Sequence, residues 1–103
     1  MSLFNKFSII FLLGLLPSIA SADAADSKLL AQGHVDDAIA SLQHKISHSP
    51  NDADSYNLLC RAYYSLSDWD KSVSDCEKAV ALDPGNAQYH LWLGRSYGEK
   101  AEH

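Results

Sequence analysis

The sequence predicts an all-α protein in which antiparallel helix-turn-helix repeats, about two and a half of them, stack as an α-solenoid. Three observations predict this fold class. After residue 22, apolar residues recur at helical spacing, and no alternating strand pattern is longer than a few residues. Short breaks rich in Pro, Gly, Asn and Asp divide the chain into helix-sized segments. Several residue types also recur 34 positions apart.

Residues 1–22 are predicted to be a secretory signal peptide. Lys6 is followed by an apolar run from Phe7 to Leu16 and by two small-residue cleavage patterns, at 18–20 and 20–22. A membrane anchor is the alternative, but this run has about half of the roughly 20 apolar residues that span a bilayer. We therefore expect export to a bacterial periplasm or to the medium, with no stable membrane insertion after cleavage.

Five helices are predicted after the signal, over residues 23–32, 35–47, 53–65, 69–82 and 87–102. The breaks between them have local causes, because Pro50 and Pro84 cannot continue a preceding helix. Residues that can cap the following helices are Asn51 or Asp52, Ser67 in a capping box with Asp70, and Asn86. Since the connections are short, consecutive helices should be antiparallel.

A 34-residue period runs through the sequence after the signal. Residue pairs at this spacing are Pro50 and Pro84, Leu59 and Leu93, Tyr63 and Tyr97, and Arg61 and Arg95. A helix-turn-helix unit of this length resembles the tetratricopeptide repeat. The matching positions are Tyr56, Leu59, Tyr63, Ala79 and Pro84 in the middle unit, Leu93, Gly94 and Tyr97 in the third, and Ala38, Leu42 and Pro50 in the first. The resemblance implies a repeat domain over 23–103, with repeats near 19–52, 53–86 and, in part, 87–103.

The third repeat contains only its first helix, so Leu93 and Tyr97 lack the second helix that they should pack against. Repeat arrays normally need three or more units and a polar capping helix. We therefore expect the 103 residues to be a fragment of a longer protein. The alternative is a short protein that dimerises to cover this end.

The two cysteines depart from the pattern of the family. Cys60 stands where a small residue is usual, and Cys76 stands where a bulky one is usual. Both should lie on facing sides of one hairpin, at comparable distances from its turn, which is the geometry that a disulfide needs. In an exported protein we predict this disulfide. Two independent buried thiols are the alternative.

In proteins that this sequence resembles, the first helix of each repeat lines a concave groove that takes an extended peptide or a partner helix. The residues predicted for such a groove are Asn57, Arg61, Tyr64, Leu91, Trp92 and Arg95. Arg61 and Arg95 occupy equivalent positions, and the arginine fork suits carboxylates, so an acidic or carboxylate-ended peptide would fit. The alternative is that Leu58, Leu91 and Trp92 pack between repeats and that the arginines are merely solvated.

Other chemistry finds no support in the sequence. His44 and His48 are four residues apart on one helix, but a third metal ligand is not evident, so we interpret them as a solvated face and predict no metal and no cofactor. The sequence has neither a Gly-rich phosphate loop nor a G-x-S-x-G motif, which argues against an enzyme. A net charge of -5 without a basic stripe argues against a nucleic-acid partner.

The sequence therefore predicts an exported, non-catalytic scaffold that binds a peptide or a partner protein through its concave surface. A second hypothesis is the N-terminal docking arm of a longer enzyme or envelope assembly factor, whose active part lies beyond residue 103. A purely structural dimer is the third.

Overall fold

The computed structural model of the protein describes residues 24–103, and the signal peptide predicted over 1–22 lies outside the described residues. Helical residues 24–31 are followed by α2 (Val35–His48), α3 (Ala53–Ser65), α4 (Trp69–Leu82) and α5 (Ala87–Glu102). The part of the chain that the structure describes contains no strand. None of its helices is both long and apolar enough to cross a membrane. The predicted all-α fold is confirmed, and within residues 24–103 the predicted helix boundaries differ from the observed ones by one residue at most.

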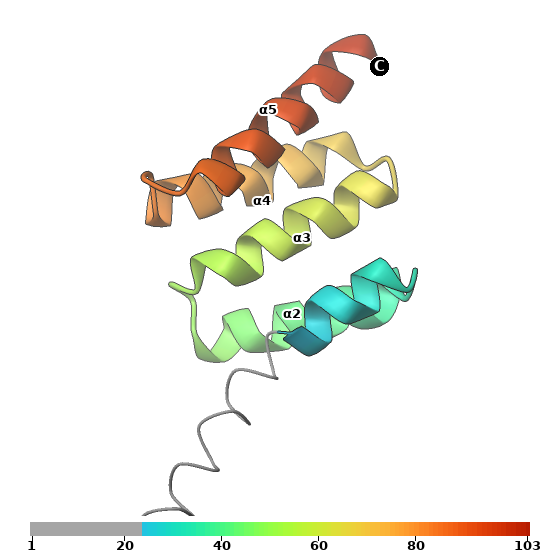
Figure 1. The fold of residues 1–103 in the computed structure, drawn as a ribbon, viewed down its shortest axis with the longest axis vertical. Coiled ribbons are helices and arrows are strands. Elements are labelled where there is room, and N and C mark those ends of the chain that lie inside the picture. Colours follow the sequence, from blue (N-terminus) through green and yellow to red (C-terminus); the bar gives the residue numbers. More distant parts are fainter. Residues whose placement is uncertain (1–23) are drawn as a thin grey trace, which may run out of the picture.

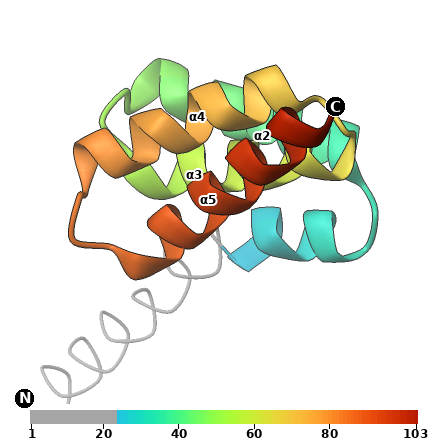
Figure 2. The same ribbon diagram turned by 90° about the horizontal axis from the view of Figure 1, so that it is seen from above.

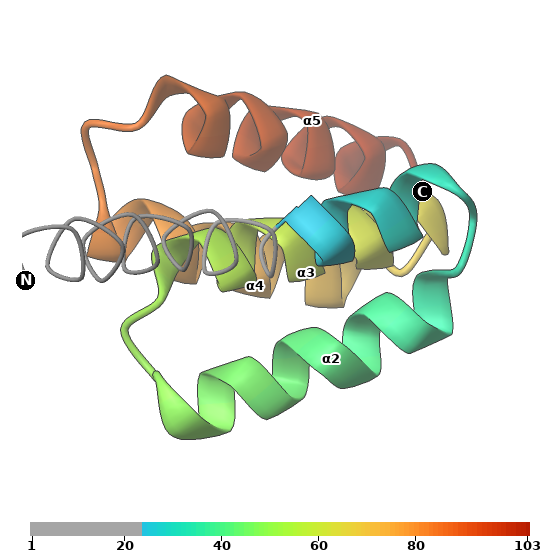
Figure 3. The same cartoon turned by 60° about the horizontal axis from the view of Figure 1, so that its bottom comes forward.

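The helices run back and forth and stack in chain order, with residues 24–31 beside α2 (Figure 1 and Figure 3). Helix α3 contacts α2, α4 and α5 directly. Seen along the stack, α2 and α4 lie on one side, whereas residues 24–31 and α5 lie on the other (Figure 2). We call the surface formed by residues 24–31, α3 and α5 the inner face, and the surface formed by α2, α3 and α4 the outer face. Helix α3 therefore contributes to both faces.

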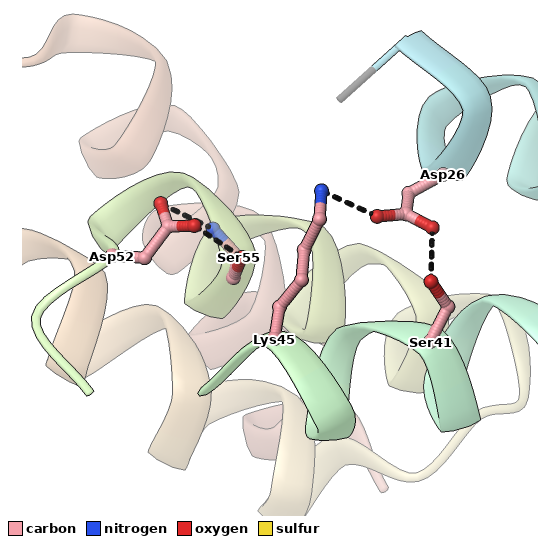
Figure 4. Close-up of polar contacts among 5 residues, drawn as sticks. All are labelled: Asp26, Ser41, Lys45, Asp52 and Ser55. Carbon is pink, nitrogen blue, oxygen red and sulfur yellow. Dashed lines mark hydrogen bonds and ion pairs between the residues drawn. The ribbon is translucent and has the colours of Figure 1, made fainter. Parts of the chain in front are cut away.

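Short polar side chains begin α3, α4 and α5, as local sequence predicts. Asp52 caps α3: its carboxylate accepts hydrogen bonds from the Ser55 amide at 3.4 Å and the Ser55 hydroxyl at 2.8 Å (Figure 4). Asn86 caps α5 by accepting from the Gln88 amide at 3.0 Å. Helix α4 differs from the prediction, because its cap is Asp68, which accepts from the amide of Lys71 at 3.3 Å. The capping box predicted for Ser67 with Asp70 is therefore wrong.

Ser67 cannot cap α4 because it belongs to the turn that ends α3. Its φ of 58° lies in the left-handed region, and its amide donates to the Tyr64 carbonyl while the Asp68 amide donates to the Tyr63 carbonyl, both at 3.0 Å. This pair of bonds is the Schellman motif that closes a helix C-terminus. Gly33, with a φ of 82°, makes the equivalent turn between residues 24–31 and α2.

The core lies where α3 meets its neighbours. Leu42, Leu58 and Leu59 form its apolar centre. Leu58 is 3% exposed, as the alternative of packing between repeats expected. Asn57 is 4% exposed, although it was predicted to line the open groove. That expectation is wrong because α3 has helices on more than one side, so one helix-wheel face does not contain all of its buried residues. In contrast, Tyr56 and Tyr63, which match the repeat pattern of the middle unit, are only half-buried.

The hairpin of α3 and α4 carries a disulfide between Cys60 and Cys76, whose Cα atoms are 5.2 Å apart. Both residues are fully buried. Beside them, the Ser72 hydroxyl of α4 donates to the Cys60 carbonyl at 2.9 Å and lies 2.7 Å from the Ser96 hydroxyl of α5. Three consecutive helices are thus joined by one small covalent and polar cluster. Because the two hydroxyls are fully buried, these hydrogen bonds offset the cost of removing them from water.

Residues 24–31 are held on α2 by a buried carboxylate. Asp26 is 2% exposed, and it accepts a hydrogen bond from the Ser41 hydroxyl at 2.6 Å. Lys45 Nζ lies 2.7 Å from its other carboxylate oxygen (Figure 4). Both partners come from α2, so this contact fixes the position of the first helical segment relative to the rest of the stack.

Candidate functional site

A hollow of about 200 Å³ opens on the inner face, between residues 24–31, α3 and α5. The residues that line it are Leu30, Ala31, Arg61, Tyr64, Ser65 and Trp92. Three of the predicted groove residues therefore come together here from two consecutive repeats. The first helical segment supplies the apolar wall, so the contact of Asp26 with α2 also positions this wall.

Trp92 is the centre of the inner face. The guanidinium carbon of Arg61, from α3, lies 5.0 Å from the centroid of the Trp92 ring, and that of Arg95, one turn further along α5, lies 4.8 Å from it. Cation–π contacts of this kind hold a guanidinium in place without using its N–H donors. The structure thus gathers Arg61 and Arg95 at one indole.

Tyr64 joins Trp92 to the turn between α3 and α4. Its ring meets the Trp92 ring edge-on at 5.5 Å and the Trp69 ring edge-on at 5.2 Å. Its hydroxyl donates to Glu99 at 3.4 Å. Trp69 was not predicted for this surface. The sequence could have indicated Trp69, because it directly follows a short turn. Such a turn brings the start of α4 back to the end of α3, where Tyr64 lies.

Arg61 keeps unused hydrogen-bonding capacity. Its Nε is buried and has no hydrogen-bond partner among residues 24–103, and the same is true of the side-chain oxygen of Asn57, one turn earlier on α3. An unpaired buried polar atom costs about 1–3 kcal/mol. The unpaired Nε is enclosed, so it is not a donor that a partner can reach.

The other two predicted groove residues lie elsewhere. Asn57 is 4% exposed, so the prediction that it contacts a partner is wrong: its side chain is enclosed by neighbouring helices. Leu91 is 46% exposed on α5 but does not line the hollow. The arrangement that remains is an aromatic and cationic patch, the inner patch, made of Arg61, Tyr64, Trp92 and Arg95.

Two groups of side chains have the composition of a metal site. His44 and His48 are exposed, with ring centroids 4.6 Å apart and Nδ1 of His48 3.0 Å from the His44 carbonyl. At the end of α5, ligand atoms of Glu99, Glu102 and His103 lie within 4.8 Å of one another. Exposed acidic groups are common without a metal, so the cluster at the end of α5 does not by itself indicate a metal site. His44 and His48 supply two ligands only.

The hairpin of α3 and α4 matches a known repeat. The family model of the tetratricopeptide repeat matches residues 53–86. A stretch of 65 residues is 34% identical to sperm-associated antigen 1 of Mus musculus and covers 63% of this chain. The chain spans about 7% of the length of that relative. These similarities, with the stacked hairpins of the structure, support a tetratricopeptide-repeat protein with an α-solenoid fold.

Proposed function

We propose that the protein is an interaction scaffold that binds a partner protein through the inner patch. Tetratricopeptide repeats suggest a protein partner. The observation that carries the proposal is the convergence of Arg61 and Tyr64 from one repeat with Trp92 and Arg95 from the next, beside an open hollow. Aromatic and arginine side chains are the residue types that dominate binding energy in interfaces.

An acidic or carboxylate-ended segment is the partner chemistry that fits the inner patch best. The two guanidinium groups are already oriented by the Trp92 ring, so little side-chain entropy is lost when they bind a carboxylate. Tyr64 and Trp92 would supply apolar contact area for the same segment.

We also propose that the scaffold acts after export, in an oxidising compartment such as a bacterial periplasm. The order of charge, apolar run and small residues in 1–22 supports export. The disulfide between Cys60 and Cys76 also supports it, because such bonds persist mainly outside reducing cytosols.

A second candidate function is a docking arm within a longer enzyme or envelope assembly factor. The observation that favours it is that the similar segment of sperm-associated antigen 1 is a small part of that protein. In this case the inner patch would have the same role, and the chemistry would lie in residues outside this sequence.

The test selects peptides from a random display library on the purified, oxidised protein and measures their affinities by fluorescence anisotropy. We expect enrichment of acidic or carboxylate-ended sequences. The double substitution Arg61→Gln and Arg95→Gln should weaken them at least about tenfold, or about 1.4 kcal/mol.

The matched control removes the same charge elsewhere, through Lys28→Gln and Lys100→Gln. Circular dichroism verifies that both variants are folded. Equal affinities of the two double variants would contradict a role for the inner patch.

A further inference from the structure

The outer face carries a groove that the inner patch does not explain. It consists of two hollows, of about 280 and 230 Å³, which share Tyr56 and Lys78. The residues lining the first are Gln43 and Ile46 of α2, Tyr56, Leu59 and Tyr63 of α3, and Lys71, Ser74, Asp75 and Lys78 of α4. The second adds Pro50, Ala81 and Leu82. We call this surface the outer groove.

Two lysines are held over the floor of the outer groove. Lys71 Nζ lies 5.3 Å from the centroid of the Tyr63 ring, and Lys78 Nζ lies 5.4 Å from that of Tyr56. The lysines are seven residues apart on α4, which places them about 10 Å apart along the helix axis. Their ammonium groups are therefore positioned over the groove by the tyrosine rings.

The outer groove is richer in hydrogen-bond donors than in acceptors. The Tyr63 hydroxyl accepts from the Gln43 amide at 3.3 Å, so its own proton remains available. Within residues 24–103, Lys71 forms an ion pair with Asp68 at 3.7 Å, and Lys78 forms none within 4 Å. Asp75 is the one carboxylate of the lining. Lys78 and Lys71 lie near enough to interact with it electrostatically.

We propose that the outer groove is a second docking site, which takes an extended acidic segment of a partner protein. Two carboxylates of the segment would pair with Lys71 and Lys78. An aliphatic side chain would enter the hollow beside Leu82, which is 40% exposed. In an extended polyproline-type segment, residues three apart lie on one side about 9 Å from each other, which matches the spacing of the lysines.

Asp75 makes this site sensitive to pH. Burial raises the pKa of Asp75 to about 6, against the opposing effect of Lys78 and Lys71. The other groups that face it are Tyr56 and Tyr63 of α3 and the non-titrating Gln43 and Ile46 of α2. An incoming carboxylate raises the pKa of Asp75 further, so binding of the segment is coupled to uptake of a proton by Asp75. Affinity should therefore be higher at pH 5.5 than at pH 7.5.

The probe is a fluorescent peptide, acetylated and amidated at its ends, with two glutamates three residues apart and a leucine three residues beyond the second. The blocked C-terminus removes the terminal carboxylate that the inner patch would take. Anisotropy at pH 5.5 and 7.5 gives the affinity, and amide chemical shifts locate the peptide. We expect shifts along α4, from Lys71 to Leu82, and affinity at least about threefold higher at pH 5.5.

Four variants test the contacts. Lys71→Gln with Lys78→Gln should weaken binding at least about tenfold, whereas the charge-matched pair Lys28→Gln with Lys100→Gln should not. Asp75→Asn, which imitates the protonated side chain, should remove the pH dependence. Tyr63→Phe, which keeps the ring, should weaken binding about threefold if the hydroxyl donates to the peptide.

Three results would overturn the proposal. The first is equal affinity for a peptide with glutamine in place of both glutamates. The second is an equal loss in the two lysine pairs, which would show that only net charge matters. The third is loss of binding only in Arg61→Gln with Arg95→Gln, which would place the peptide at the inner patch and leave that proposed function intact.

Discussion

Single residues in the hairpin turns decide where one helix ends and the next begins. Gly33 and Ser67 adopt the same left-handed conformation and make the same pair of terminal hydrogen bonds. Glycine takes this conformation at no steric cost, whereas a residue with a Cβ is destabilised there by roughly 1–2 kcal/mol. Ser67 is exposed, so its side chain gains little packing in return.

Ser67→Gly should therefore stabilise the protein by about 0.5–1 kcal/mol. Glycine removes the steric cost at this position, but part of the gain is lost because glycine has more backbone entropy in the unfolded chain. Urea denaturation at constant m-value measures the difference. Ser67→Ala is the matched control, since it keeps the Cβ and should leave stability nearly unchanged. A gain of equal size in the alanine variant would show that the conformation of residue 67 is not the cause.

At the scale of elements, the first helical segment depends on one buried carboxylate. Asp26 joins residues 24–31 to α2 through Ser41 and Lys45, and the same segment supplies Leu30 and Ala31 to the inner hollow. The helices otherwise contact their neighbours in the chain, and α3 also contacts α5 of the next repeat. Contacts limited to adjacent repeats are the energetic behaviour of repeat proteins. Loss of one such contact should loosen the end of the array more than its centre.

Asp26→Ala should destabilise the protein by about 2 kcal/mol. This is less than the usual cost of breaking a buried ion pair, because the Lys45 side chain is 25% exposed and water can solvate its charge. Hydrogen exchange should accelerate at amides of residues 28–34, and much less in α4 and α5. Asp36→Ala, an exposed carboxylate in the first turn of α2, is the control. Unchanged exchange at residues 28–34 would mean that apolar contacts alone hold the segment.

At the scale of the whole molecule, the disulfide ties the hairpin on which the other helices pack. Cys60 and Cys76 are 16 residues apart, and the hairpin they close contacts both α2 and α5. In the chain-entropy account, closing a loop of about this length stabilises a protein by about 3 kcal/mol. The neighbouring Ser72 and Ser96 hydroxyls extend the same cluster into α5.

The double substitution Cys60→Ala and Cys76→Ala should therefore lower stability by about 3 kcal/mol, which for a domain of this size lowers Tm by more than about 10 °C. Thiol labelling of the denatured, non-reduced protein should find no free cysteine. Two labelled thiols in exported protein, or an unchanged Tm after reduction, would contradict a disulfide that stabilises the hairpin.

Local sequence determined the elements of this protein. Helix boundaries, the caps at Asp52 and Asn86, and the 34-residue repeat could be predicted because prolines, capping side chains and apolar periodicity act within a few residues of the chain. The proximity of Arg61 and Arg95 also follows from the 34-residue period, because equivalent residues in stacked repeats lie close together.

Only the tertiary structure decided which sides of α3 are covered. A helix with a single packing partner buries one face, but α3 has α2, α4 and α5 around it, so Asn57 and Leu58 are enclosed while Tyr56 and Tyr63 open onto the outer groove. The position of Trp69 beside Tyr64 and the burial of Asp75 likewise depend on how neighbouring helices meet. Burial depends on the positions of residues distant in the chain, and for that physical reason the sequence of one helix could not specify it.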